Sequence, residues 1–99
     1  MNNNIIFNWS EEKNLLLKKT RNLSFEDVVV AIEGGDLIDI VSSCSKNHQE
    51  QSCFIVKINN YAHIVPYVEN EEGIFLKTIY PSRKYKNHLI KMPNKYEKN

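Results

Sequence analysis

Four side chains in the second half of the chain have types suited to phosphodiester chemistry, namely His63, Tyr67, Lys77 and Arg83. Cleavage of RNA through its 2′-hydroxyl needs a group that takes the hydroxyl proton, positive charge beside phosphorus and a proton for the leaving oxygen. A histidine can move protons near neutral pH, and His48 is a second candidate for that role. Lys77 and Arg83 could hold the phosphate, and Tyr67 could assist either task. Because this chemistry needs no metal and the nearby carboxylates lack ligand spacing, we expect no metal site and no cofactor.

Three short runs rich in β-branched and aromatic residues must position these side chains, at 53–58, 61–68 and 74–80. They predict an antiparallel meander. The pair Asn59-Asn60 suits a two-residue hairpin, since Asn tolerates positive φ, and this hairpin would pair Val56 with His63. A five-residue loop at 69–73 would pair Val68 with Ile74.

Opposed residues of such a meander share a face. One predicted face carries Phe54, Val56, Ile58, Tyr61, His63, Val65, Tyr67, Phe75, Lys77 and Ile79, with Arg83 continuing the same parity. The other carries Cys53, Ile55, Lys57, Ala62, Ile64, Pro66, Val68, Ile74, Leu76, Thr78 and Tyr80. The second face is almost wholly apolar and is the predicted seat of the helices. The first face would stay uncovered and could bind an RNA strand. The RNA bases would stack on its aromatic rings, and its cationic side chains would offset the charge of the phosphates.

Two helices are predicted before the meander, over 10–21 and 24–33. Ser10 and Ser24 are N-cap residues, and Asp27 follows Ser24 at the spacing of a capping box. The double glycine 34–35 ends the second helix. Runs at 5–9 and 37–41 predict further strands, 42–52 is a polar loop, and a short helical turn is expected within 82–91. The prediction is an α+β domain spanning 1–99, with two N-terminal helices packed on one face of a small, mainly antiparallel sheet, a core over 5–86 and a loosely held tail at 87–99.

Composition limits the function classes. The chain has 99 residues, with 13 basic and 12 acidic side chains and a net charge of +1, so any basic surface must be local. No run approaches the length of a membrane span, and the first residues lack the charged start of a signal peptide, so we expect a cytoplasmic protein without a membrane partner. Cys44 and Cys53 lack metal-ligand spacing; reduced thiols are expected, with a disulfide as the alternative.

Three short motifs occur in a recognisable order: FNWSEEKN at 7–14, NLSFEDV at 22–28 and PSRK at 81–84. In this order and spacing the chain resembles the BrnT-like toxins, whose members typically show F-x-W-D-x-x-K-N, G-I-S-F-E-E-A and S-A-R-K. The match covers about residues 5–86. It departs from the family pattern at Ser10, at Asn22, at Pro81-Ser82 and in the 42–52 loop.

The resemblance implies a RelE-type (RelE-like) fold and a ribonuclease, the toxin of a bacterial type II toxin–antitoxin pair. Its partner would be an antitoxin with a ribbon–helix–helix part, and DNA would be met only through that antitoxin. Arg83 and Lys84 carry over by motif and Lys13 less directly; Lys84, Lys13 and His48 are then candidates for binding RNA. The alternative is a non-catalytic module of the same fold that binds RNA or protein. Each residue also has a purely structural interpretation: His63 and Tyr67 as packing residues, and Lys77 as a solvated strand residue.

Overall fold

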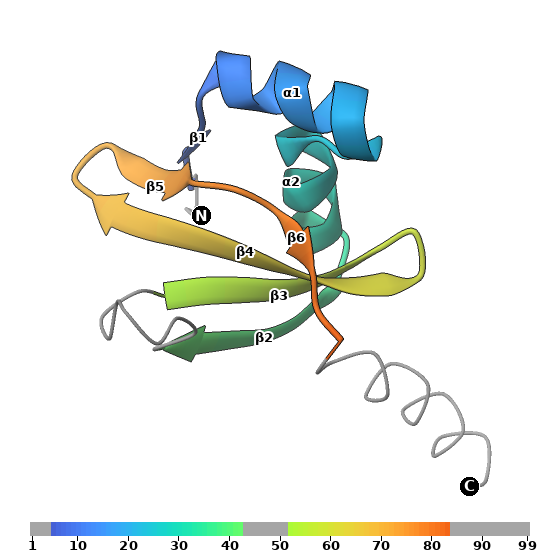
Figure 1. Ribbon diagram of the computed structural model, residues 1–99. Coiled ribbons are helices and arrows are strands. Elements are labelled where there is room, and N and C mark those ends of the chain that lie inside the picture. The colour runs from blue at the N-terminus through green and yellow to red at the C-terminus, as the bar shows by residue number, and fades with distance from the viewer. Residues whose placement is uncertain (1–4, 43–51, 84–99) are drawn as a thin grey trace, which may run out of the picture.

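The computed structural model describes residues 5–42 and 52–83 and shows an α+β fold, as the sequence predicts (Figure 1). Two helices, α1 (Glu11–Arg21) and α2 (Phe25–Glu33), follow the short strand β1 (Phe7–Asn8). The remaining strands are β2 (Leu37–Ser42), β3 (Ser52–Ile58), β4 (Tyr61–Asn70), β5 (Gly73–Leu76) and β6 (Tyr80–Pro81). The sheet order is β1-β5-β4-β3-β2, with β6 also paired to β4. Only the β1–β5 pairing is parallel among the described strands. The predicted helical turn and tail after Arg83 lie outside the described residues.

Local signals position both helices close to their predicted bounds. The Ser10 hydroxyl accepts from the backbone N–H of Lys13 at 3.2 Å, and α1 ends at Asn22, which has a positive φ of 57°. A complete capping box starts α2: the Ser24 hydroxyl accepts from the Asp27 N–H, and the Asp27 carboxylate accepts from the Ser24 N–H. These bonds satisfy backbone donors that have no partner inside a helix.

The junction between the helices is held by Asn14, a fully buried side chain. Its Oδ1 accepts from the Phe25 N–H at 2.7 Å, and its Nδ2 donates to Glu26 Oε1 at 2.9 Å. The second bond favours the carboxylate form and lowers the pKa of Glu26. The ring of Trp9 also stacks on Phe25, with centroids 5.7 Å apart. The start of α1 and the start of α2 are therefore fixed against each other.

Replacing Asn14 should measurably loosen this junction. We expect Asn14→Ala to lower the free energy of unfolding by about 2 kcal/mol, because a buried backbone N–H at Phe25 loses its acceptor. Urea denaturation of the wild type and the variant gives the difference. Asn8→Ala is the matched control, since Asn8 is exposed and its change should stay within about 0.5 kcal/mol. Equal stability of the Asn14 variant and the wild type would contradict this account.

The first hairpin of the meander is as predicted, and the second is not. Asn59 and Asn60 have φ of 55° and 64°, and Val56 pairs with His63. In the second hairpin Val68 pairs with Phe75, not with Ile74, because β4 and β5 continue to Asn70 and Gly73. The turn thus has two central residues, stabilised by the Glu72 N–H donating to Asn70 Oδ1 at 2.8 Å. This one-residue shift moves every β5 side chain to the face opposite the predicted one.

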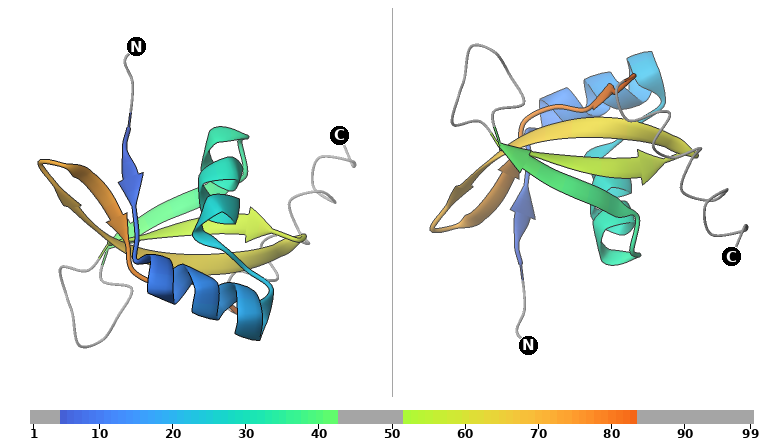
Figure 2. Two further views of the ribbon diagram at one scale, coloured as in Figure 1. Left: turned by 90° about the horizontal axis from the view of Figure 1, so that it is seen from above. Right: turned by 90° about the horizontal axis from the view of Figure 1, so that it is seen from below.

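The helices cover the face that was predicted to remain open. Phe54, Val56, Ile58 and Val65 belong to the same hydrophobic core as residues of both helices, and Phe25 of α2 is fully buried within it. In the right-hand view of Figure 2, strands β2, β3 and β4 lie in front, with the helices behind them on one side. The prediction was wrong because both faces are apolar, and the helices pack on the one with more large side chains. The side chains of His63 and Tyr67 belong to this helix-covered face.

Cys53 corrects a further expectation. Its side chain is fully buried and it is disulfide-bonded, so the expected reduced thiol is wrong and the alternative holds for this residue. The other cysteine of the chain, Cys44, lies outside the described residues. The separation of Cys44 and Cys53 along the chain could not decide between reduced thiols and a disulfide, because it does not give the distance between the two residues in space.

Candidate functional site

A hollow of about 460 Å³ opens where the end of α1, the Asn59-Asn60 turn and β6 meet. It is lined by Arg21, Leu23, Asn59, Tyr61, His63, Tyr80 and Pro81. The pairing of β6 with the first half of β4 builds one wall, since His63 lies opposite Pro81 and Ile64 opposite Tyr80. Strand, turn and helix end thus bring a histidine, an arginine and two tyrosines to one place.

The protonation state of His63 follows from its surroundings. The ring is almost buried, with 6% of the residue exposed, and Nδ1 lies 2.9 Å from the carbonyl oxygen of Tyr61. A carbonyl can only accept, so Nδ1 carries the hydrogen and Nε2 is left as the proton acceptor of a neutral ring. Burial lowers the pKa of His63 below 6.5, against an opposing effect of the bond to Tyr61. The residue is therefore a neutral base at pH 7.

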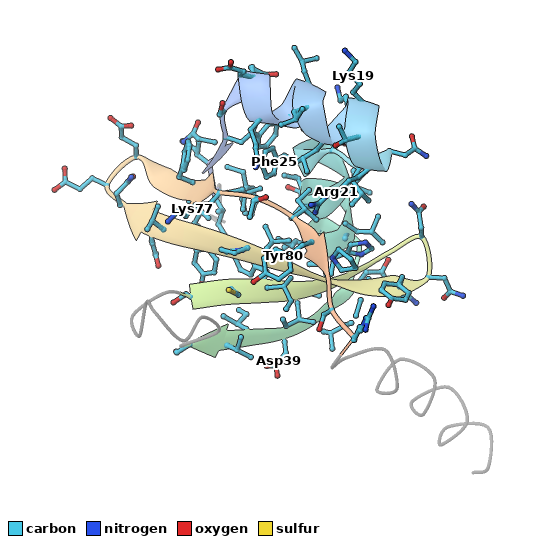
Figure 3. All side chains as sticks on the ribbon, viewed as in Figure 1. Lys19, Arg21, Phe25, Asp39, Lys77 and Tyr80 are labelled. Atoms are coloured by element: carbon cyan, nitrogen blue, oxygen red, sulfur yellow. The ribbon has the colours of Figure 1, made fainter. Side chains whose placement is uncertain are left out.

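Arg21 supplies the positive charge of the hollow. Its Nη1 donates to the carbonyl oxygen of Ile79 at 2.9 Å, which ties the end of α1 to the segment between β5 and β6. Figure 3 shows Arg21 reaching from α1 toward this segment, which continues into Tyr80. The bond uses one of five guanidinium N–H groups, and a guanidinium matches the geometry of a phosphate. An anion in the hollow would therefore meet a cation whose position is already fixed.

The two tyrosines complete the hollow. Tyr61 follows the hairpin turn, and its ring makes an edge contact with the imidazole of His63, at 5.7 Å between centroids and 66° between planes. Tyr80 lies on β6 and is half-buried. Each phenol offers a ring face for a base and a hydroxyl that can donate or accept a hydrogen bond. Together these groups provide the proton acceptor, the cation and the hydroxyl donors that cleavage of an RNA phosphodiester through its 2′-hydroxyl requires.

Among the residues singled out by sequence that the structure describes, only His63 lines this hollow. Tyr67 instead stacks on Phe54, with centroids 4.0 Å apart, and packs against the core. Lys77 lies just beyond β5 with an exposed side chain, and Arg83 is exposed two residues after β6. Lys13 lines a different hollow on the outer side of α1. His48 and Lys84 lie outside the described residues.

Sequence reasoning missed Arg21, Tyr61 and Tyr80 as site residues. Arg21 fits the usual pattern of a basic residue in the last turn of a helix, where its charge complements the negative end of the helix dipole. Nothing in the local sequence connects it with His63. Tyr61 did carry a signal, because it lies two residues before His63 on the same face of a strand. Tyr80 comes beside this pair only through the pairing of β6 with β4, which the unbroken strand predicted over 74–80 concealed.

Within 5–42 and 52–83, no three His, Cys, Asp and Glu side chains gather in a way that could hold a metal ion. None of the described helices has the length and hydrophobicity to cross a membrane. Comparison with known proteins finds no match for the chain among family models, curated proteins or solved structures. The function must therefore be inferred from the hollow and from the motifs.

The buried histidine should make the fold sensitive to acid. Its folded-state pKa is lowered, so between that pKa and the unfolded value of about 6.5 the unfolded chain binds more protons. Stability should therefore fall as the pH drops below about 6.5 and continue to fall until the folded-state pKa is reached. Subtracting the urea stability of His63→Asn from that of the wild type at each pH removes the carboxylate contributions. A difference that does not change with pH would contradict the assignment.

Proposed function

We propose that this chain is a metal-independent ribonuclease, the toxin of a bacterial type II toxin–antitoxin pair that acts in the cytoplasm. The observation that carries the proposal is the neutral His63 beside Arg21 in one open hollow. Nε2 of His63 takes the proton of a 2′-hydroxyl, whose oxygen then attacks phosphorus. Arg21 holds the phosphate, and a tyrosine hydroxyl or water gives a proton to the departing 5′-oxygen. The products are a 2′,3′-cyclic phosphate and a 5′-hydroxyl.

The motifs that resemble the BrnT-like family support this proposal from a second direction. Two of them meet in space, because Trp9 stacks on Phe25 and Asn14 binds both Phe25 and Glu26. Their side chains thus form one helix junction, which gives a physical reason for the two motifs to occur together. The α+β architecture agrees with the fold that the resemblance implies. The finer assignment to a RelE-type fold is part of the proposal.

A ribbon–helix–helix antitoxin would be the partner, and DNA would be bound only through it. We expect induced expression of the chain to arrest bacterial growth and coexpression with the antitoxin to relieve the arrest. The purified chain should cut RNA in EDTA and leave cyclic phosphate ends. RNA binding without cleavage products at high protein excess would favour the non-catalytic binding module, and cleavage abolished by EDTA would contradict the proposed chemistry.

A further inference from the structure

The outward side of α1 carries an apolar pair between two opposite charges. Leu15 and Leu16 are 62% and 51% exposed. Glu12 and Lys19 continue the same stripe, since residues three and four apart are neighbours on a helix. All four line a shallow hollow of about 490 Å³. Figure 3 shows Lys19 pointing away from the sheet on this outermost helix.

The opposite side of α1 is fully used by the fold. Leu17 belongs to the core, Asn14 binds the start of α2, and Arg21 binds the segment before β6. The helix is therefore held in one orientation, and the Glu12–Lys19 stripe takes no part in holding it. Two adjacent leucines left in water are unfavourable, because burial of such side chains is the main source of association energy.

The order of charges in the stripe selects the kind of partner. Glu12 and Lys19 lie at equal distances from the midpoint between Leu15 and Leu16. When two copies of α1 lie antiparallel about a two-fold axis through this midpoint, Glu12 of each copy faces Lys19 of the other. Leu15 then faces Leu16. A parallel pair would place Glu12 on Glu12 and Lys19 on Lys19, which repel each other.

We propose that the Glu12–Lys19 stripe is a self-association surface and that its partner is a second copy of this chain. The contact is isologous, so every favourable pair occurs twice. Four side chains from each copy make a contact smaller than a standard protein interface, which gives a weak dimer that forms as concentration rises. The proposal does not depend on the ribonuclease function, because none of the stripe residues lines the His63 hollow.

Charge reversal tests this surface. Sedimentation velocity on the full chain across a wide concentration range should show a reversible monomer–dimer equilibrium for the wild type. We expect Glu12→Lys or Lys19→Glu alone to raise the dissociation constant about tenfold, since each places two like-charged pairs in the contact. The double variant with both reversals should recover the wild-type constant. Glu33→Lys, the same charge change at an exposed position on α2, should have no effect.

Thermal unfolding of each variant shows that the fold is intact, which is expected because all these positions are exposed. A wild type that stays monomeric at every concentration overturns the proposal. The partner of the stripe would then be a different protein. Single reversals without an effect also overturn it, as does a double variant that remains as weak as the single ones.

Discussion

His63→Asn is expected to lower the rate of RNA cleavage by about 10²- to 10⁴-fold, the usual loss when a general base is removed. The asparagine Nδ2 lies near the position of the imidazole Nδ1, so it can still donate to the carbonyl oxygen of Tyr61. Nε2, the proton acceptor, has no counterpart in asparagine. The variant therefore separates the chemical role of His63 from its structural bond. Single-turnover cleavage of a defined RNA by equal amounts of folded protein provides the measurement.

Two arginine variants form the matched comparison for this experiment. Arg21→Ala removes the cation that lines the hollow, while Arg83→Ala removes an exposed cation outside it, although the sequence motif favours Arg83 as the catalytic residue. We expect a large loss of cleavage for the first and a small one for the second. Circular dichroism and thermal unfolding show that each variant is folded. A fully active, well-folded His63→Asn protein would exclude the hollow as the catalytic site.

Gly73→Ala is expected to destabilise the fold strongly, with a cost of about 3 kcal/mol or more. Gly73 has φ of 127°, a conformation that side-chain-bearing residues rarely adopt. An added Cβ would clash with the carbonyl oxygen of Ile6, which itself accepts from the Ile74 N–H at 2.8 Å. The nearest contact atom belongs to the backbone and not to the end of a flexible side chain, so relief requires moving β1 away from β5. Urea denaturation gives the cost.

Gly35→Ala separates backbone strain from this clash. Gly35 also has a positive φ, of 92°, but a Cβ there would meet no atom within 4 Å. It should therefore show the strain alone, a cost of about 1 kcal/mol. If both alanine variants lose the same free energy of unfolding, the close approach of β1 to Gly73 adds nothing to the cost. That result would contradict the clash expected at the β1–β5 edge.

The parts of the fold that sequence predicts correctly depend on local chemistry. The capping box at Ser24 and Asp27 fixes the start of α2 within four residues of chain. The first hairpin follows from two asparagines that adopt positive φ. The second hairpin was misassigned by one residue because its loop, rich in acids and ending in Gly73, is compatible with two lengths. The bond from Glu72 to Asn70 decides between them, and composition does not reveal it.

The site was harder to predict because its members meet only through tertiary packing. His63 was identified from its chemistry alone, whereas Arg21 and Tyr80 come from elements distant in sequence. The face of the sheet was misassigned for a different reason. Both faces of the meander are apolar, so a pattern of alternation cannot state which one the helices cover. Which face the helices cover depends on how Phe25 and Val28 of α2 pack against β3. Such packing involves the helix surface and the sheet surface at once, so the pattern within one strand does not reveal it.

The parallel pairing of β1 with β5 joins two segments far apart in the described chain, since Phe7 lies opposite Ile74. During synthesis β1 leaves the ribosome long before β5 is made. Until then the backbone N–H and C=O groups of β1 cannot form their hydrogen bonds with β5. Closing so long a loop is slow compared with forming the Asn59-Asn60 hairpin. We therefore expect this edge to be completed last in folding, so that a nascent chain lacking β5 keeps β1 exposed to water.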